Sequence, residues 1–122
     1  MTIYNNLPVY KTSYDLLLQV FEVVKNFTKE YKYTLGDKIK NEIIALITSI
    51  YRANNSFEKR LENIRQAREQ IEVLRLYIRI IKDLKLVKLE KFADLNENIE
   101  SLSKQLLAWE NSLKNKKETK FL

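Results

Sequence analysis

The chain has 122 residues, of which 45% are hydrophobic, and its formal net charge is +6. It contains no Cys and no His, which excludes disulfides, thiol nucleophiles, the usual zinc ligands and the commonest general acid–base side chain. Its single Gly and single Pro are too few for the regular turns of a β-sandwich or barrel. We therefore expect one all-α domain that has no catalytic site, cofactor, metal or small-molecule substrate.

The N-terminus has no basic segment followed by an apolar stretch, so no signal peptide is predicted. No apolar run reaches the roughly 18 residues of a membrane span. The expected location is the cytoplasm, without membrane contact. The excess of basic over acidic residues favours binding to polyanions such as nucleic acid, or to an acidic protein surface.

A first helix is predicted at about residues 11–31, because apolar side chains recur there at steps of three and four. The row expected to face the core contains Tyr10, Tyr14, Leu17, Phe21, Val24, Thr28 and Tyr31. A second apolar row on the same helix contains Leu16, Val20, Val23 and Phe27.

A second helix is predicted at about 34–54, where Thr34 and Asp37 have the spacing of a capping box. Its buried stripe is expected to contain Ile39, Ile43, Leu46, Ile47 and Ile50. A third helix is predicted at about 57–84, with Ser56 as its N-cap. Its expected core row is Phe57, Leu61, Ile64, Ala67, Ile71, Leu74, Ile78 and Ile81.

A fourth helix is predicted at about 88–114, on an unbroken heptad pattern that implies left-handed supercoiling. The heptad residues are Phe92, Leu95, Ile99, Leu102, Leu106, Trp109 and Leu113. Short loops between long helices favour an antiparallel up-down-up-down four-helix bundle over residues 1–114. Residues 115–122 are expected to form a basic, flexible tail.

All six arginines lie between residues 52 and 79, although the chain has 16 lysines spread along its length. They are Arg52, Arg60, Arg65, Arg68, Arg75 and Arg79. Arg68, Arg75, Arg79 and Lys82 fall on one stripe at the shoulder of the third helix's core row. Arg suits such a position because it binds phosphate or carboxylate through a planar fork. Ion pairing inside the bundle, with Glu69 and Glu72 nearby, is an equally open interpretation.

The third helix also has a second apolar row, roughly opposite the first. It contains Val73, Leu76, Tyr77, Ile80 and Leu84. A helix that is apolar on both sides is expected to be buried on both sides. We therefore predict that this row contacts another subunit or another protein.

Four segments resemble the superfamily of four-helix-bundle proteins that includes those encoded by ribosomal RNA intervening sequences. Tyr31–Ile39 and Ile50–Asn54 resemble its first and second helices. Leu74–Arg79 and Leu106–Trp109 are similar to the third and fourth helices of the accessory variability determinants of diversity-generating retroelements. The resemblance covers about residues 8–115.

This resemblance implies a homopentameric barrel of four-helix bundles with a positively charged surface. It implies reverse transcriptase, RNA of the template-repeat region and DNA as partners, in support of mutagenic cDNA synthesis catalysed by the transcriptase. Arg52, Arg75 and Arg79 match basic positions of the family's motifs. Arg60, Arg65, Arg68 and Lys82 are candidate partner-binding or nucleic-acid-binding residues from their spacing alone.

Two other functions fit the same residues. The chain could be a ribosomal-intervening-sequence type of bundle, or a protein–protein module in which the basic charge is incidental. The carboxylates on the fourth helix, such as Asp94, Glu97 and Glu100, could suggest an enzyme. They lie at polar positions beside lysines, which is the usual pattern of surface ion pairs.

Overall fold

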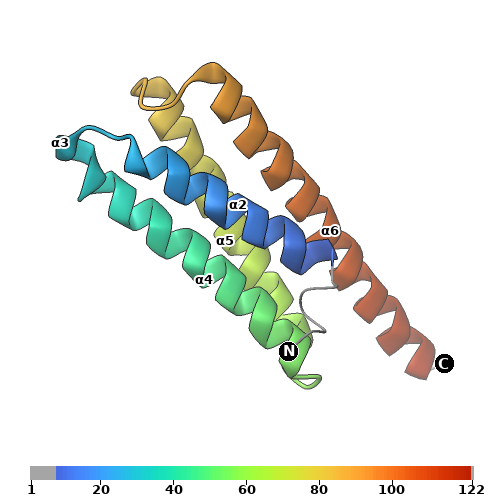
Figure 1. Ribbon diagram of the computed structural model, residues 1–122. Coiled ribbons are helices and arrows are strands. Elements are labelled where there is room, and N and C mark those ends of the chain that lie inside the picture. The colour runs from blue at the N-terminus through green and yellow to red at the C-terminus, as the bar shows by residue number, and fades with distance from the viewer. Residues whose placement is uncertain (1–7, 122) are drawn as a thin grey trace.

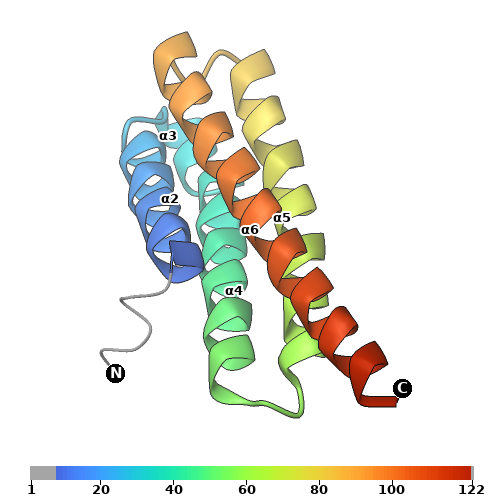
Figure 2. The same cartoon turned by 90° about the vertical axis from the view of Figure 1, so that its right-hand side faces the viewer.

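The computed structural model describes residues 8–121, with side chains through residue 115. Within that part of the chain, four long helices and one short helix follow one another. They are α2 (Pro8–Lys25), α3 (Lys29–Lys32), α4 (Leu35–Asn55), α5 (Arg60–Asp83) and α6 (Leu89–Phe121). The long helices run antiparallel to their neighbours, and α2 and α5 each pack against both α4 and α6 (Figures 1 and 2). The predicted four-helix bundle is confirmed.

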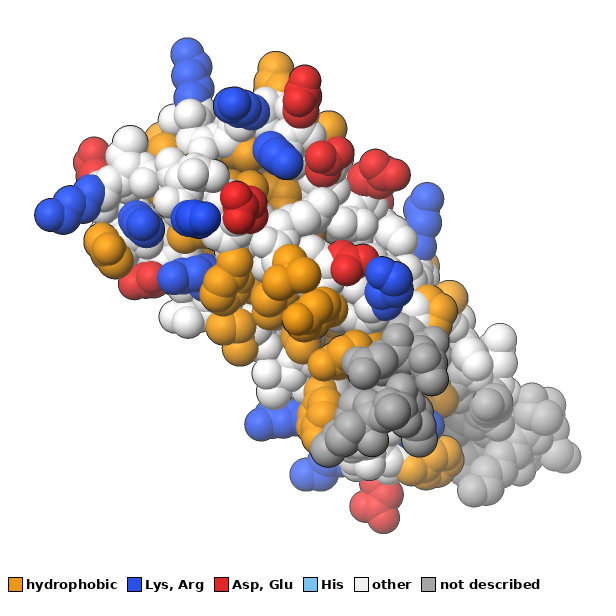
Figure 3. Space-filling view, viewed as in Figure 1, with side chains coloured by type: hydrophobic (Ala, Val, Ile, Leu, Met, Phe, Trp, Pro, Cys, Tyr) orange, Lys and Arg blue, Asp and Glu red, His pale blue; other side chains and the backbone are white. Residues whose placement is uncertain are grey.

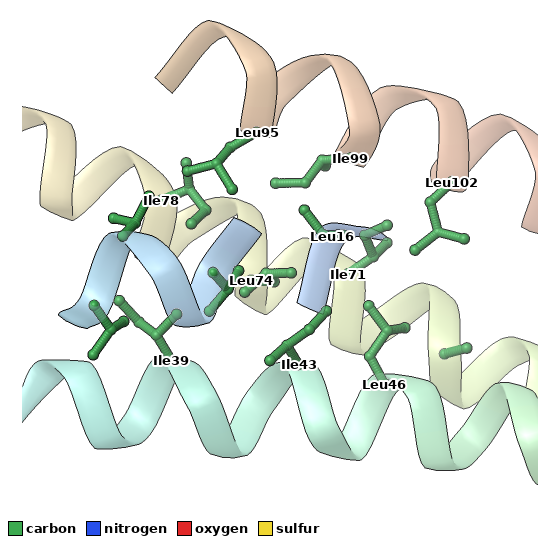
Figure 4. Close-up of a cluster of buried hydrophobic side chains, with 14 of the residues drawn as sticks. Leu16, Ile39, Ile43, Leu46, Ile71, Leu74, Ile78, Leu95, Ile99 and Leu102 are labelled. Atoms are coloured by element: carbon green, nitrogen blue, oxygen red, sulfur yellow. The ribbon is translucent and has the colours of Figure 1, made fainter. Parts of the chain in front are cut away.

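The core lies along the axis of the bundle, and all four long helices contribute to it. Leucine and isoleucine side chains from each helix point into the same interior (Figure 4). Burial removes each of them almost completely from water, which stabilises the fold by about 1.5–3 kcal/mol per side chain. Most of the predicted rows of α4, α5 and α6 is confirmed, although Ile47 and Leu113 are only half-buried. The buried members are Ile39, Ile43, Leu46, Ile50, Ile64, Ala67, Ile71, Leu74, Ile78, Ile81, Leu95, Ile99, Leu102 and Leu106.

The core face of α2 is mainly the second apolar row. Of the row expected from the sequence, Val24 is buried, and Tyr10, Leu17 and Tyr31 pack partly buried against the core. Leu16, Val20 and Val23 are buried, whereas Tyr14 is 49% exposed and Phe21 is also exposed. Both rows have the helical period, so periodicity alone does not rank them. Packing decides, because compact aliphatic side chains fill the interior while a Tyr hydroxyl remains in water at lower cost.

The first helix is shorter than predicted, because the chain turns after Lys25. The Asn26 side chain donates a hydrogen bond to the Glu22 carbonyl (3.1 Å), and its backbone N–H bonds only three residues back. Asn and Thr side chains compete with helical hydrogen bonds in this way. Thr28 is extended and precedes α3, so the prediction of one helix through residue 31 is wrong. The turn still buries Phe27.

Gly36 is required where α3 and α4 meet α2. A Cβ atom there would lie 2.7 Å from Val24 Cγ1 and 3.3 Å from the carbonyl oxygen of Tyr31. The capping box predicted at Thr34 does not form. Its hydroxyl donates to the Glu30 carbonyl at 2.9 Å instead, because Thr34 lacks the extended conformation of a capping residue.

α5 begins at Arg60 rather than at residue 57. Ser56 Oγ accepts a hydrogen bond from the Lys59 N–H (3.3 Å), so it caps the turn that precedes the helix. Phe57 lies in this turn and is 80% exposed, so its assignment to the core was wrong. The helical spacing of the core row does not apply before the helix has started.

α5 ends in a motif that the sequence did not signal. The N–H of Leu86 donates to the Ile81 carbonyl (2.8 Å), and that of Lys85 donates to the Lys82 carbonyl (2.9 Å). These two bonds define a Schellman motif, whose left-handed position is usually Gly. Here it is Lys85, with φ of 61°.

α6 continues to Phe121, through the segment expected to be a flexible tail. That segment contains no Gly or Pro, and its Lys and Glu residues are good helix formers. Side chains beyond residue 115 lie outside the described part, as does Leu122. None of the described helices is both long and apolar enough to cross a membrane.

Candidate partner and nucleic-acid surfaces

Two of the predicted arginines converge with Lys114 on one buried carboxylate of α6. Arg68 Nη1 donates a hydrogen bond to Glu110 Oε1 at 2.8 Å, and Arg65 Nε lies 3.8 Å from Oε2. Lys114 Nζ lies 3.0 Å from the same Oε2. Glu110 is only 3% exposed, whereas its three cationic partners remain about half exposed.

These contacts keep Glu110 ionised. The hydrogen bond from Arg68 and then that from Lys114 hold the pKa of Glu110 below its usual value of 4.5, although burial opposes them. A buried carboxylate that lost these partners would carry an uncompensated charge. The ion pairs of Glu110 with Arg65 and Arg68 therefore join α6 to α5.

Arg75 forms a second link between the same helices. Its Nε lies 3.2 Å from Glu72 Oε2 within α5, and its guanidinium also pairs with Glu100 of α6. Ion pairing within the bundle is thus present for Arg65, Arg68 and Arg75. We call these three arginines, with Glu72, Glu100, Glu110 and Lys114, the arginine flank.

Arg60 has a different structural task. Its Nε donates to the Ala53 carbonyl at 2.8 Å and its Nη2 donates to the Asn54 carbonyl at 3.1 Å. The last carbonyls of a helix have no partner within the helix. Arg60 therefore caps the end of α4, and its guanidinium also lies 5.5 Å from the Phe57 ring centroid.

The other three predicted basic residues are available at the surface. Arg52 is exposed, and its side chain makes no ion pair or hydrogen bond with the described residues. Arg79 and Asp83 form an exposed pair at 3.7 Å, of a kind that contributes little to stability. Lys82 Nζ lies 4.9 Å above the Phe92 ring. The structure therefore does not gather all seven residues into one site.

The row predicted as an interface on α5 is largely at the surface. Leu76 is 59% exposed, Val73 and Leu84 are also exposed, and Tyr77 and Ile80 are half-buried. Tyr77 also packs against the core of its own bundle. The row remains a candidate contact surface.

A second apolar surface was missed in the sequence. It covers α2 and the neighbouring α4, where Figure 3 shows hydrophobic side chains gathered. We call it the apolar α2–α4 face, and its exposed members are Tyr14, Leu18, Phe21, Ile44 and Tyr51. Two apolar rows on the first helix are the available signal, but their common helical period does not show which of them faces the solvent.

A sequence model of the bAvd-like family matches residues 7–113, nearly the whole chain. The chain belongs to the bAvd-like family. The resemblance to accessory variability determinants is thereby confirmed. The chain has no significant match among curated proteins.

The segments that carried the resemblance also have roles in the fold of this family member. Gly36 permits the close approach of α3, α4 and α2. Ala53 is fully buried and its carbonyl is capped by Arg60. Arg75 joins α5 to α6, while Trp109 packs partly buried against the core. Much of the motif therefore specifies the bundle rather than a binding site.

Proposed function

We propose that this protein is a non-catalytic accessory factor of a diversity-generating retroelement, acting in the cytoplasm. In this role it binds the reverse transcriptase and the template RNA and supports mutagenic cDNA synthesis. The match of the bAvd-like family over residues 7–113 is the observation that carries the proposal. The basic charge and the exposed apolar surfaces of the bundle support a binding role.

Self-association into a ring, with a homopentamer as the expected form, is part of the proposal. A closed ring needs two different complementary surfaces on each subunit. We assign these roles to the apolar α2–α4 face and the outer row of α5 (Val73, Leu76, Tyr77, Ile80 and Leu84), because both expose apolar side chains. α2, which carries Tyr14, Leu18 and Phe21, and α5, which carries the second surface, lie at opposite corners of the bundle, each packed mainly against α4 and α6.

The oligomer is tested by measuring mass in solution with light scattering. We expect the wild type to be a multiple of the 14.6 kDa chain, near five copies. Leu76→Lys on α5 and Leu18→Lys on α2 should each lower the mass, since both surfaces are needed to close a ring. Lys104→Glu, on the exposed side of α6, is the matched control. A monomeric wild type would contradict this part of the proposal.

The accessory role is tested by co-expression with the reverse transcriptase that we expect to be encoded in the same locus. We expect the tagged protein to retain the transcriptase and its template RNA, and mutagenic cDNA synthesis to require both proteins. A reverse-transcriptase gene and a repeat pair in the same locus are part of the expectation. A gene inserted in 23S rRNA would instead support the ribosomal-intervening-sequence type of bundle.

A protein–protein module is the second candidate, and one observation favours it. Arg65, Arg68 and Arg75 are engaged with carboxylates of the bundle, which leaves fewer arginines for nucleic acid. This function predicts retention of the transcriptase without RNA. RNA binding by the isolated protein that weakens steeply with salt would contradict it.

A further inference from the structure

Two connections between helices lie at the same end of the bundle. The chain passes from α2 through α3 into α4 at that end, and the loop from α5 to α6 lies beside it in both views (Figures 1 and 2). Residues 25–40 form the first connection and its flanks, and residues 79–91 form the second. We call these two segments together the lysine end.

The lysine end holds the whole excess charge of the protein. Its two segments contain ten Lys or Arg and four Asp or Glu, a net charge of +6. The full chain has 22 basic and 16 acidic residues, so the remaining residues are balanced at twelve of each. Lys and Arg side chains gather at this end in Figure 3, with fewer acidic ones between them.

Most of these cations have no partner within the described residues. Seven lysine side chains there form no ion pair or hydrogen bond, and six of the seven are exposed. They are Lys25, Lys29, Lys32, Lys38, Lys85, Lys88 and Lys91. Lys40 and Lys82 lie over the rings of Phe21 and Phe92, at 5.6 and 4.9 Å. In the arginine flank, by contrast, each arginine already pairs with a carboxylate.

The backbone at Lys85 adds an independent observation. Lys85 has a φ of 61°, a left-handed conformation in which Gly is preferred because it has no Cβ. The chain nevertheless has Lys at this position, with an exposed side chain. A non-Gly residue held in this region costs stability, and such costs are concentrated at functional positions. In exchange for this cost, Lys85 places an exposed positive charge at the lysine end.

We propose that the lysine end is the surface that binds the phosphodiester backbone of single-stranded RNA. Lysine ammonium groups act as mobile point charges, and they suit phosphate contacts that do not depend on sequence. Each neutralised phosphate releases a counterion, which makes the affinity depend steeply on salt. The inference rests on the proposed RNA-binding function and locates it on different residues from those of the arginine flank.

The test compares two triple variants of equal net charge. Lys29→Gln/Lys38→Gln/Lys88→Gln neutralises the lysine end on both connections. Lys11→Gln/Lys59→Gln/Lys104→Gln neutralises three exposed lysines elsewhere. Binding of a labelled single-stranded RNA of about 20 nucleotides is followed by fluorescence anisotropy over roughly 50–300 mM KCl. Circular dichroism and mass in solution establish that both variants keep the fold and the assembly of the wild type.

We expect the lysine-end variant to lose affinity by roughly 10- to 100-fold near 100 mM salt, and its slope against log salt to fall by about two. The control should retain most of the affinity. Equal losses in both variants would show that only net charge matters and would overturn the inference. RNA binding retained by the lysine-end variant, with loss of the transcriptase, would instead make this end a protein-docking surface. A wild type without RNA binding at low salt would contradict the RNA-binding function itself.

Discussion

Arg65 and Arg68 on the arginine flank and Lys29 and Lys88 at the lysine end carry the same charge in different surroundings. The arginines converge on the buried carboxylate of Glu110, so much of their field is compensated within the bundle. The lysines project from two helix connections and have no partner among the described residues. A basic residue is therefore informative about ligands only after its own neighbours are known. Stability should depend on the first region, and polyanion binding on the second.

The largest change in stability is expected from Glu110→Gln. The substitution removes the charge on which Arg68, Arg65 and Lys114 converge, and the loss of charged hydrogen bonds of this kind costs about 1.5–3 kcal/mol. Unfolding by urea measures the loss. Glu97→Gln on the exposed side of α6 is the control and should change little. RNA affinity should change little and equally in the two variants, which remove the same charge; a rise confined to Glu110→Gln would mean that the released arginines of the arginine flank also contact RNA.

The pH dependence of stability separates two carboxylates. The lowered pKa of Glu110 means that its stabilising effect is present at neutral pH and is lost as the pH falls below 4.5 through its folded pKa. The difference in unfolding free energy between the wild type and Glu110→Gln should therefore shrink in acid. A difference that stayed constant down to about pH 2 would show that the stabilising effect of Glu110 does not depend on its ionisation.

Glu42 of α4 should behave in the opposite sense. Burial raises its pKa above 4.5, so its ionised form opposes folding at neutral pH. Glu42→Gln should increase the stability slightly at pH 7, and the gain should disappear as the pH falls through the raised pKa. Urea unfolding at several pH values measures this. A loss of stability at pH 7 would show that Glu42 has a stabilising partner, for example in another subunit.

The smallest change in stability is expected from Lys85→Gly. This substitution should increase the stability of the fold and weaken RNA binding. Gly removes the Cβ penalty of the left-handed position and should raise the unfolding free energy by about 0.5–1 kcal/mol. The same change removes one cation from the lysine end, so RNA affinity should fall by a few-fold. Lys91→Gly, inside α6, is a contrasting control, since it should lower the stability. A rise in stability without loss of RNA affinity would remove Lys85 from the binding surface.

The fold could be predicted wherever a helix had a single apolar row. The heptads of α6 and the stripe of α4 correspond to buried residues such as Leu102 and Ile43. The prediction failed on α2, where two rows compete, and at Asn26, where a side-chain hydrogen bond ends the helix. The end of α5 could not be predicted either, because its left-handed position is occupied by Lys85 and not by the Gly that usually marks such an end.

The candidate surfaces were less predictable than the core. The sequence alone determined an all-α chain with a basic excess and no His or Cys, since composition and periodicity are properties of the chain itself. It also carried the resemblance to the family. Only the tertiary structure decided which charges are already paired, because the partners of Arg68 and Arg75 lie on α6, far along the chain. Only the tertiary structure, likewise, brought residues 25–40 and 79–91 to one end of the bundle.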